Sequence, residues 1–345
     1  MADISVILPC YNVESYIDRC LTSITLQTIG MDALEIICID DASTDGTWNH
    51  LQEWEQKYPE NIMLVHCDVN GRQGTARNIG LQYASTDWIA FIDSDDWLEL
   101  DYFEKLYSIT QMGDFDIVSC QNKRDFSSTL TFFDDRGTGR ENRFMLIDTV
   151  EKRKLFFNLQ SAGLGACNKI IRKELLIDNH IYFPENLAYE DCYWGPLLHF
   201  YAKRVYLIEE NLYHYFVNRH STVLQMDADY HTDWLTVQSM KWDEWVQRGF
   251  LADYREELEY DFLCTCYLGF LKIIFLRYTE PSYSLYLLVK EITLEKVSDY
   301  RQNKYIKEGL SEFYSTLIET LLLPLDKSQF QQLARNAKAY WNAKQ

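Results

Sequence analysis

Short apolar runs alternate with amphipathic segments through the first hundred residues. Four runs indicate strands, at residues 4–8, 34–39, 62–66 and 88–92. The segments between them carry apolar residues at helical spacing, at 16–27, 47–58 and 74–83. This alternation is typical of βαβ units around a sheet that is buried on both faces. We therefore predict an α/β fold with a mixed, mostly parallel sheet flanked by helices.

The pattern changes further along the chain. Strands are expected at 115–120, 168–171, 204–208 and 213–217, and helices at 102–111, 151–159 and 188–199. A polar stretch at 124–143 is either a lid or a surface excursion. From residue 229 onward the pattern is almost wholly helical. We predict a first domain of residues 1–228, with halves 1–100 and 101–228, and an α-helical domain of residues 229–345.

The charge of the chain narrows the classes of function that it can have. The 345 residues carry a net charge of −19, which argues against a nucleic-acid binder because phosphate contacts need a basic surface. Residues 1–100 hold 17 Asp and Glu against 4 Lys and Arg. Such an excess forms either a solvated surface or a group of carboxylates that holds a cation.

Cysteine usage and the chain's start point to a compartment. The nine cysteines are spread without a CxxC pair, which argues against a zinc site and against a disulfide framework. No basic leader precedes the first strand, and no apolar run approaches the ~20 residues of a membrane span. We expect a cytoplasmic protein, with peripheral contact at the inner face of the membrane left open.

Polar residues follow the predicted strands. Asn12, Asp40, Asp41 and Asn70 each come directly after an apolar run, and so does the acidic segment 93–96. One such residue alone would be read as a helix cap. Several at the same sheet edge favour a ligand site, because ligands of open α/β sheets lie beyond the carboxyl ends of the strands.

The acidic segment is the strongest single feature. Asp93, Asp95 and Asp96 place three carboxylates within four residues at the end of a buried strand, where they repel one another unless a cation lies between them. Hard divalent cations prefer such ligands, and Mg²⁺ typically shares one or two of them with substrate phosphates. A solvated acidic turn is the alternative. The chain contains neither a P-loop nor a G-x-G-x-x-G fingerprint.

Five motifs together resemble glycosyltransferase family 2, which has the GT-A fold. They are Ser5-Val-Ile-Leu-Pro-Cys-Tyr-Asn12, Leu21-Thr-Ser-Ile-x-x-Gln27-Thr28, Ile39-Asp-Asp-Ala-Ser-Thr-Asp45-Gly46, Gly74-Thr-Ala-Arg77-Asn78-x-Gly80 and Ile89-x-Phe-x-Asp-Ser-Asp-Asp96. Their order and spacing match the family over residues 4–100, and the resemblance fades after about residue 225.

The resemblance implies a UDP-sugar donor site. Its expected residues are Pro9, Tyr11, Asn12, Glu14, Asp40, Asp41, Arg77, Asn78, Asp93 and Ser94. Tyr11 would face the uracil, and Asp41, more than Asp40, would accept its N3–H. Arg77 and Asn78 would neighbour the sugar or the diphosphate. In the D-x-D motif, Asp93 would contact ribose or metal, Asp95 would ligate Mn²⁺ or Mg²⁺, and Asp96 is a second-rank ligand.

The acceptor side rests on two later segments. Glu190 and Asp191 resemble the family's Glu-Asp motif, so Asp191 is the expected general base and Glu190 its neighbour. Acidic residues at a helix start are otherwise explained by the helix dipole. Arg219 and His220 resemble a stretch that faces the diphosphate, although a loop histidine without such a role is the alternative.

The resemblance implies an inverting enzyme that moves a sugar from UDP to an acceptor hydroxyl, on a polysaccharide, a lipid-linked sugar or a glycoprotein glycan. A nucleotide-sugar-binding scaffold without turnover is the alternative. An aspartyl-phosphate phosphatase is disfavoured because Trp97 stands where that chemistry needs Thr or Val. The helical tail is expected to form its own core, with a homo-oligomer contact or a membrane-facing patch left open.

Overall fold

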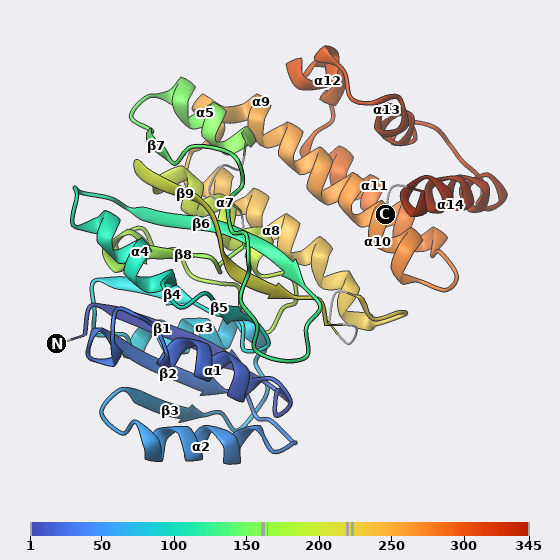
Figure 1. Ribbon diagram of the computed structural model, residues 1–345. Coiled ribbons are helices and arrows are strands. Elements are labelled where there is room, and N and C mark those ends of the chain that lie inside the picture. Colours follow the sequence, from blue (N-terminus) through green and yellow to red (C-terminus); the bar gives the residue numbers. More distant parts are fainter. Residues whose placement is uncertain (1, 160–162, 164, 219–220, 222–223, 344–345) are drawn as a thin grey trace. The chain divides into compact units, whose positions relative to one another are not determined.

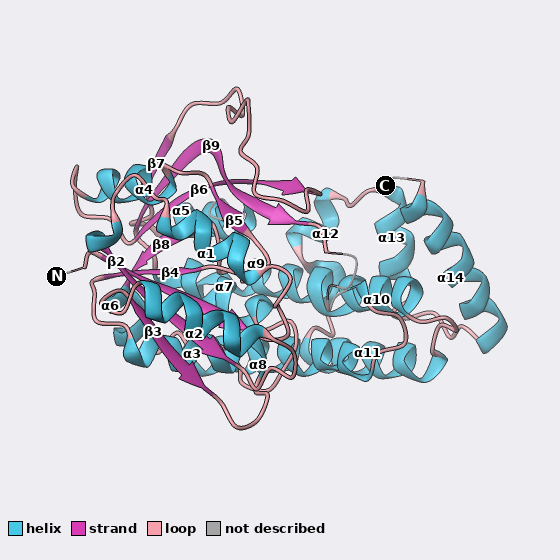
Figure 2. Cartoon of the chain, turned by 60° about the horizontal axis from the view of Figure 1, so that its bottom comes forward, coloured by secondary structure: helices cyan, strands magenta, loops and turns pink. Residues whose placement is uncertain are grey.

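The computed structural model describes residues 2–159, 163, 165–218, 221 and 224–343. The chain folds into two compact units, Met1–Asn218 and Arg219–Gln345. Figure 2 shows the strands in the first unit, while the described part of the second unit contains helices only. This confirms the expected α/β fold followed by a helical C-terminal region.

One nine-stranded sheet runs through the described part of the first unit, in the order β3-β2-β1-β4-β8-β6-β9-β5, with β7 beside β9 (Figure 1). Its strands are β1 (Ile4–Cys10), β2 (Leu34–Asp40), β3 (Ile62–His66), β4 (Trp88–Phe91), β5 (Trp97–Leu98), β6 (Ile117–Asp125), β7 (Arg143–Leu146), β8 (Lys169–Arg172) and β9 (Arg204–Phe216). The first four strands pair in parallel, and β8 joins them antiparallel to both β4 and β6.

Helices cover both faces of this sheet. They are α1 (Ile17–Thr25), α2 (Thr47–Lys57), α3 (Arg72–Tyr83), α4 (Tyr102–Thr110), α5 (Val150–Leu159), α6 (Lys173–Asp178) and α7 (Asp191–Tyr201). Alternate residues of β1, such as Val6, pack into a core shared with α1, α2 and α4. Ile7 faces the other side, where a Cβ on Gly80 of α3 would lie 2.4 Å from its Cγ2. Gly80 therefore lets α3 lie directly on the sheet.

The structure corrects the expected pattern in the second half of the unit. The runs at 204–208 and 213–217 are one bent strand, β9, because its register against β6 shifts around Gln121 and the chain never leaves the sheet. Strand β6 extends to Asp125, into the stretch expected to be a loop, and α6 and β7 were not expected. Polar exposed residues on β6 hid its outer end from a hydrophobicity pattern.

The second unit is built from α8 (Asp233–Gln247), α9 (Leu251–Phe262), the π-helical segment η4 (Leu263–Gly269), α10 (Phe270–Arg277), α11 (Tyr283–Lys296), α12 (Lys304–Glu308), α13 (Glu312–Glu319) and α14 (Lys327–Asn342). Its aromatic rings pack on one another, as Tyr286 does on Phe330 at 4.8 Å, so the helical tail has a core of its own. None of the described helices has the length and apolar character needed to cross a bilayer.

Candidate active site

The candidate residues lie where β1, β2 and β4 end. Several non-glycine residues around this edge adopt positive φ angles, among them Asn12 (52°), Ala42 (60°), Arg72 at the start of α3 (65°) and Tyr189 (66°). Left-handed backbone is costly for such residues and concentrates at functional sites, where the surrounding contacts hold it. The edge is thus built from loops in fixed, unfavourable conformations.

The loop after β1 is fastened to the loop after β2. Asn12 Oδ1 accepts from the Thr44 amide at 2.8 Å, and Glu14 Oε2 accepts from the Gly46 amide at 2.6 Å. These two side chains therefore hold the protein's own backbone. Pro9 is buried within β1, whereas Tyr11 is 47% exposed. Of the expected uracil–ribose residues, Tyr11 is the one whose ring is open to a ligand.

Asp40 and Asp41 point to different partners. Asp40 is fully buried and its Oδ2 lies 2.7 Å from His66 Nδ1, while its Oδ1 has no hydrogen-bond partner among the described residues. Asp41 Oδ1 accepts from the Gly71 amide at 2.8 Å. Burial raises the pKa of Asp41, although the amides of Gly71 and Arg72 oppose that shift. Asp41 closes the turn that leads into α3.

The acidic segment forms a tight turn in which the Asp96 amide donates to the Asp93 carbonyl at 3.0 Å. Asp96 is buried, and its two carboxylate oxygens accept from the Tyr213 hydroxyl at 2.6 Å and the Phe216 amide at 2.7 Å. Burial, followed by the charges of Asp95 and Asp93, raises its pKa well above the usual range. Asp96 therefore ties the turn to β9, and Ser94 is buried beside it.

Asp95 is more open than Asp96. It is half-buried, and its Oδ2 lies 3.5 Å from Asn218 Nδ2. Burial and then the charge of Asp93 raise the pKa of Asp95 to about 6. Since a buried carboxylate beside another carboxylate is stabilised by any nearby cation, Asp95 is poised to receive one.

Arg77 links two parts of the first unit that lie far apart in the sequence. It is buried on α3, where its Nη2 donates to Asp93 Oδ1 at 2.8 Å and its Nη1 donates to Glu190 Oε1 at 2.5 Å. Burial disfavours the charged guanidinium, but the carboxylates of Asp93 and Glu190 outweigh it and raise the pKa of Arg77. The D-x-D turn and the Glu-Asp segment are therefore brought together through one cation.

The segment before α7 is held against α3. Asn78 Nδ2 donates to the Phe183 carbonyl and Asn78 Oδ1 accepts from the Phe183 amide, both at 2.9 Å. A Cβ on Gly74 would lie 2.5 Å from the Pro184 carbonyl and 3.2 Å from Glu190 Cβ. Asn78 thus fixes backbone, whereas the sequence suggests a contact with the donor. Gly74 provides the space that lets Glu190 approach.

Asp191 is the first residue of α7 and is half-buried. Burial raises its pKa, with Arg77 opposing the shift and the charge of Asp93 adding to it. The charges of Asp93 and Arg77 are therefore felt at Asp191, next to Glu190. A carboxylate whose pKa is raised in this way is a stronger base than a solvated one. Arg219 and His220 lie outside the described residues.

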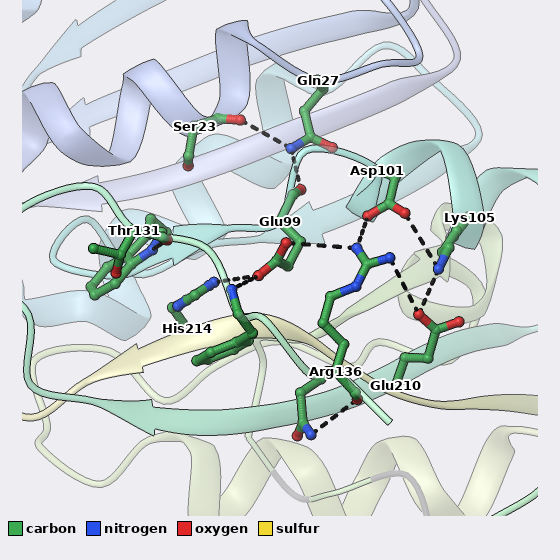
Figure 3. A network of polar contacts seen from close by, with 12 residues as sticks. Ser23, Gln27, Glu99, Asp101, Lys105, Thr131, Arg136, Glu210 and His214 are labelled. Carbon is green, nitrogen blue, oxygen red and sulfur yellow. Dashed lines mark hydrogen bonds and ion pairs between the residues drawn. The ribbon is translucent and has the colours of Figure 1, made fainter. Parts of the chain in front are cut away.

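Ser23 of α1 and Gln27, just beyond the end of that helix, hold the stretch that follows the D-x-D turn, a role that their motif did not reveal. Gln27 Nε2 donates to the Glu99 carbonyl at 2.7 Å and to the Ser23 carbonyl at 3.0 Å (Figure 3). Ser23 Oγ accepts from the Leu98 amide at 3.1 Å. Ser23 lies on α1, whereas Gln27 follows the end of that helix, so the signal available in the sequence was only that both residues stand in one motif.

The residues present fit a divalent cation shared with a diphosphate. Among the described residues, no three His, Cys, Asp or Glu side chains are grouped to hold a metal by themselves. Asp93 and Asp95 instead offer hard oxygen donors whose repulsion a cation would relieve. One or two carboxylates completed by phosphate oxygens are the usual surroundings of Mg²⁺.

Comparison with protein families gives one match. The sequence model described as "Glycosyl transferase family 2" matches residues 5–179. EpsH of Bacillus subtilis (strain 168) is 29% identical over 265 residues, which cover 74% of this chain and 73% of EpsH. A poly(ribitol-phosphate) beta-glucosyltransferase of Bacillus spizizenii is 30% identical over 221 residues. That match covers 63% of this chain but only 32% of the relative, so the chain spans about a third of that protein.

A solved structure extends the likeness along the chain. Residues 1–349 of Staphylococcus aureus TarS, solved in complex with UDP, align with a TM-score of 0.68 and 19% identity. The alignment covers 99% of this chain and 92% of that one. At this level of identity the likeness shows the fold, and it includes the helical region.

Proposed function

The chain belongs to glycosyl transferase family 2, and on that basis we propose that it transfers a hexose from a UDP-sugar to a hydroxyl of a polymeric acceptor with inversion at the sugar. Two relatives support the choice of donor and acceptor. TarS has been solved with UDP-GlcNAc, at a TM-score of 0.66 to this chain. A relative with 30% identity is named a poly(ribitol-phosphate) beta-glucosyltransferase, so a polyol-phosphate polymer of the teichoic acid type is the acceptor class we favour.

The observation that carries this proposal is the double contact of Arg77. One guanidinium pairs with Asp93 of the D-x-D turn and with Glu190, the neighbour of the expected base. A single displacement needs the leaving diphosphate and the general base around the same anomeric carbon. Arg77 gives the two groups a common anchor.

The residues then divide the reaction among them. Tyr11 faces the uracil ring, and the carboxylate of Asp41 receives its N3–H. Asp191 accepts the proton of the acceptor hydroxyl while that oxygen attacks the anomeric carbon and the bond to the UDP phosphate breaks. A divalent cation on Asp93 and Asp95 would offset the charge that develops on departing UDP. Arg77 holds the Glu190 carboxylate in an ion pair and opposes the rise that burial causes in the pKa of Glu190, so we assign the proton of the acceptor hydroxyl to Asp191.

The domain division follows from these roles. We assign residues 1–100 to donor binding and residues 101–228 to the acceptor side of one catalytic domain. We assign residues 229–345 to a helical domain. For this domain we propose a role in oligomerisation, in membrane binding or in acceptor binding. Experiments that identify the acceptor and the sugar should use the full chain, because its relatives differ in length and their substrates cannot simply be transferred to it.

Binding and turnover are tested separately. Calorimetry with UDP, with and without MnCl₂, should show cation-dependent binding. A panel of UDP-glucose, UDP-galactose and UDP-N-acetylglucosamine with a poly(ribitol-phosphate) acceptor should then release UDP with one of them. Binding of UDP without turnover of any donor would favour a sugar-nucleotide scaffold. The absence of UDP binding in the presence of Mn²⁺ would contradict the proposal altogether.

A further inference from the structure

Arg19 contacts the acidic turn from outside the donor and acceptor residues. It is half-buried on α1, and its Nη2 donates to the Asp95 carbonyl at 2.6 Å. Its Nη1 donates to the Ser127 carbonyl at 2.7 Å, and its guanidinium carbon lies 3.9 Å from the centre of the Trp97 ring. The Arg19 side chain therefore contacts the backbone of the candidate metal ligand Asp95, the ring of Trp97, and the distant residue Ser127.

That distant segment, residues 126–136, is here called the strap. It is fastened to the stretch that directly follows the D-x-D turn (Figure 3). Trp97 Nε1 donates to the Thr131 carbonyl at 2.7 Å, and Arg136 Nη1 donates to Asp101 Oδ1 at 2.5 Å. The stretch expected to be either a lid or a surface excursion is thus held by side-chain hydrogen bonds at several points along the strap.

Ring contacts join the same parts. The Phe133 ring of the strap lies 3.7 Å from the His214 ring, with 13° between their planes, and His214 lies 4.7 Å from the Trp97 ring. His214 Nε2 is 2.9 Å from Glu99 Oε1, the same oxygen that accepts from the Phe133 amide at 2.7 Å. Trp97 is therefore held by the strap through its indole N–H and through His214, and it also contacts Arg19.

We propose that Arg19 is a positioning residue for the donor site: it fixes the backbone of Asp95, and so the carboxylate that would meet the diphosphate-bound cation, and it couples that backbone to the strap. A carboxylate can serve a cation only if its Cα is held at the correct distance, and contacts behind the ligand set that distance. The Asp95 carbonyl is held by Arg19, while α1 also reaches the turn through Cys20 Sγ, 3.8 Å from the Asp93 carbonyl. This inference rests on the proposed function.

A second arginine of the same unit provides a matched control. Arg172 lies with its guanidinium carbon 5.0 Å from the Trp88 ring and donates to the Phe115 carbonyl at 3.0 Å and to Asp114 Oδ1 at 2.8 Å. Like Arg19, it lies over a tryptophan ring and donates to a backbone carbonyl, and it differs in pairing with a carboxylate. Trp88 begins β4, whereas the D-x-D turn follows that strand's other end. Replacing Arg172 therefore shows how far the loss of an arginine stacked on a tryptophan, away from the D-x-D turn, changes the Mn²⁺ requirement and KM.

The experiment measures UDP binding to the full chain at rising MnCl₂ concentrations, together with KM and kcat for the accepted UDP-sugar. Arg19→Gln should raise the Mn²⁺ concentration for half-maximal UDP binding about tenfold or more, as losing a residue behind a ligand does in metal sites. KM for the donor should rise with it, while kcat at saturating Mn²⁺ and donor changes less than about threefold. Arg172→Gln should leave the Mn²⁺ requirement and KM unchanged.

Arg19→Lys keeps the charge but cannot donate to two carbonyls with a planar fork. It should show a smaller shift in the same direction, and it serves as the main variant if Arg19→Gln does not fold. A Mn²⁺ requirement equal to that of the wild type in a folded Arg19 variant would overturn the inference and leave the proposed function standing. A wild-type chain without Mn²⁺-dependent UDP binding would overturn both.

Discussion

Arg77 and Glu190 are 113 positions apart in the chain, yet Nη1 of one lies 2.5 Å from Oε1 of the other. Both side chains are buried, and the second guanidinium nitrogen holds Asp93. An ion pair that is closed off from water depends on all its members, because removing one leaves the others charged and unpaired. The D-x-D turn and the segment that begins α7 are therefore linked energetically as well as in space.

Replacement of Arg77 by Met should destabilise the protein strongly. Asp93 and Glu190 would lose the cation that stabilises their carboxylates, and breaking comparable buried pairs costs about 3–5 kcal/mol. Urea unfolding followed by circular dichroism measures the loss. Arg255→Met is the control, since Arg255 is 63% exposed and meets Glu259 at 3.5 Å, a surface pair worth less than about 1 kcal/mol. Equal losses for the two variants would contradict the assigned role of Arg77.

Gly74→Ala should impair catalysis through geometry alone. The new Cβ would lie 2.5 Å from the Pro184 carbonyl and 3.2 Å from Glu190 Cβ, both of which would have to move. A displacement of about 1 Å at a reacting group can cost on the order of 100-fold in rate. We expect kcat/KM for the UDP-sugar to fall by roughly 10- to 100-fold, measured by UDP release.

The control for Gly74 is another glycine of the same unit. A Cβ added at Gly165 would meet no atom of the described residues within 4 Å, and Gly165 is not among the glycines with positive φ. Gly165→Ala should therefore leave kcat/KM within about twofold, as surface substitutions without lost contacts usually do. A Gly74 variant with the same rate as Gly165→Ala would show that Glu190 does not need its close approach to α3.

The sequence predicted the first four strands and the polar residues beyond them, because buried parallel strands are continuous apolar runs and their ends are marked by polar residues. It could not predict the roles of Asp96 or Asn78. Both stand in motifs as polar residues next to expected ligands, but their partners, Tyr213 and Phe183, come more than a hundred positions later. The pairing of Arg77 with Glu190 was hidden for the same reason.

Asp95→Asn and Asp96→Asn should separate binding from stability. Asp95 carries the open carboxylate, so its amide variant should weaken Mn²⁺-dependent UDP binding by about 1.4 kcal/mol or more, tenfold in Kd, as read by calorimetry. Asp96 accepts from both Tyr213 and Phe216, and an amide can accept at only one of its two positions. Asp96→Asn should lose about 1–3 kcal/mol of unfolding free energy. If instead Asp96→Asn weakened UDP binding and Asp95→Asn lowered the unfolding free energy, Asp95 would be excluded as the principal metal ligand.

Asp191→Asn should abolish transfer while UDP still binds. A general base contributes roughly 10²- to 10⁴-fold to a rate, and kcat should fall by that factor. The Kd for UDP in the presence of Mn²⁺ should stay within about threefold, because the proposed contacts to the nucleotide come from other residues. Near-wild-type turnover of this variant would remove Asp191 from the mechanism and direct attention to Glu190.

Acid should destabilise the protein through His199. This residue is buried in α7, where Nε2 donates to the Gly163 carbonyl at 3.3 Å and Nδ1 has no partner in the described part of the chain. Burial, and then the nearby charge of Lys169, lowers the pKa of His199 to about 3 from 6.5. Between these values the unfolded chain binds a proton that the folded chain does not. Unfolding is therefore favoured as the pH falls below 6.5.

The contribution of His199 to the pH dependence of stability can be isolated with variants of two residues whose rings are in contact, His199 and Phe156. Relative to His199→Leu, the wild type should lose about 3 kcal/mol of unfolding free energy between pH 6.5 and pH 4, since each pH unit in this window contributes about 1.4 kcal/mol. Phe156, whose ring lies 4.7 Å from that of His199, has no titrating group. Phe156→Leu should shift stability equally at both pH values. A difference in unfolding free energy between the wild type and His199→Leu that stays constant with pH would contradict this prediction. His199 would then take up its proton in the folded state, which would mean that water reaches the side chain.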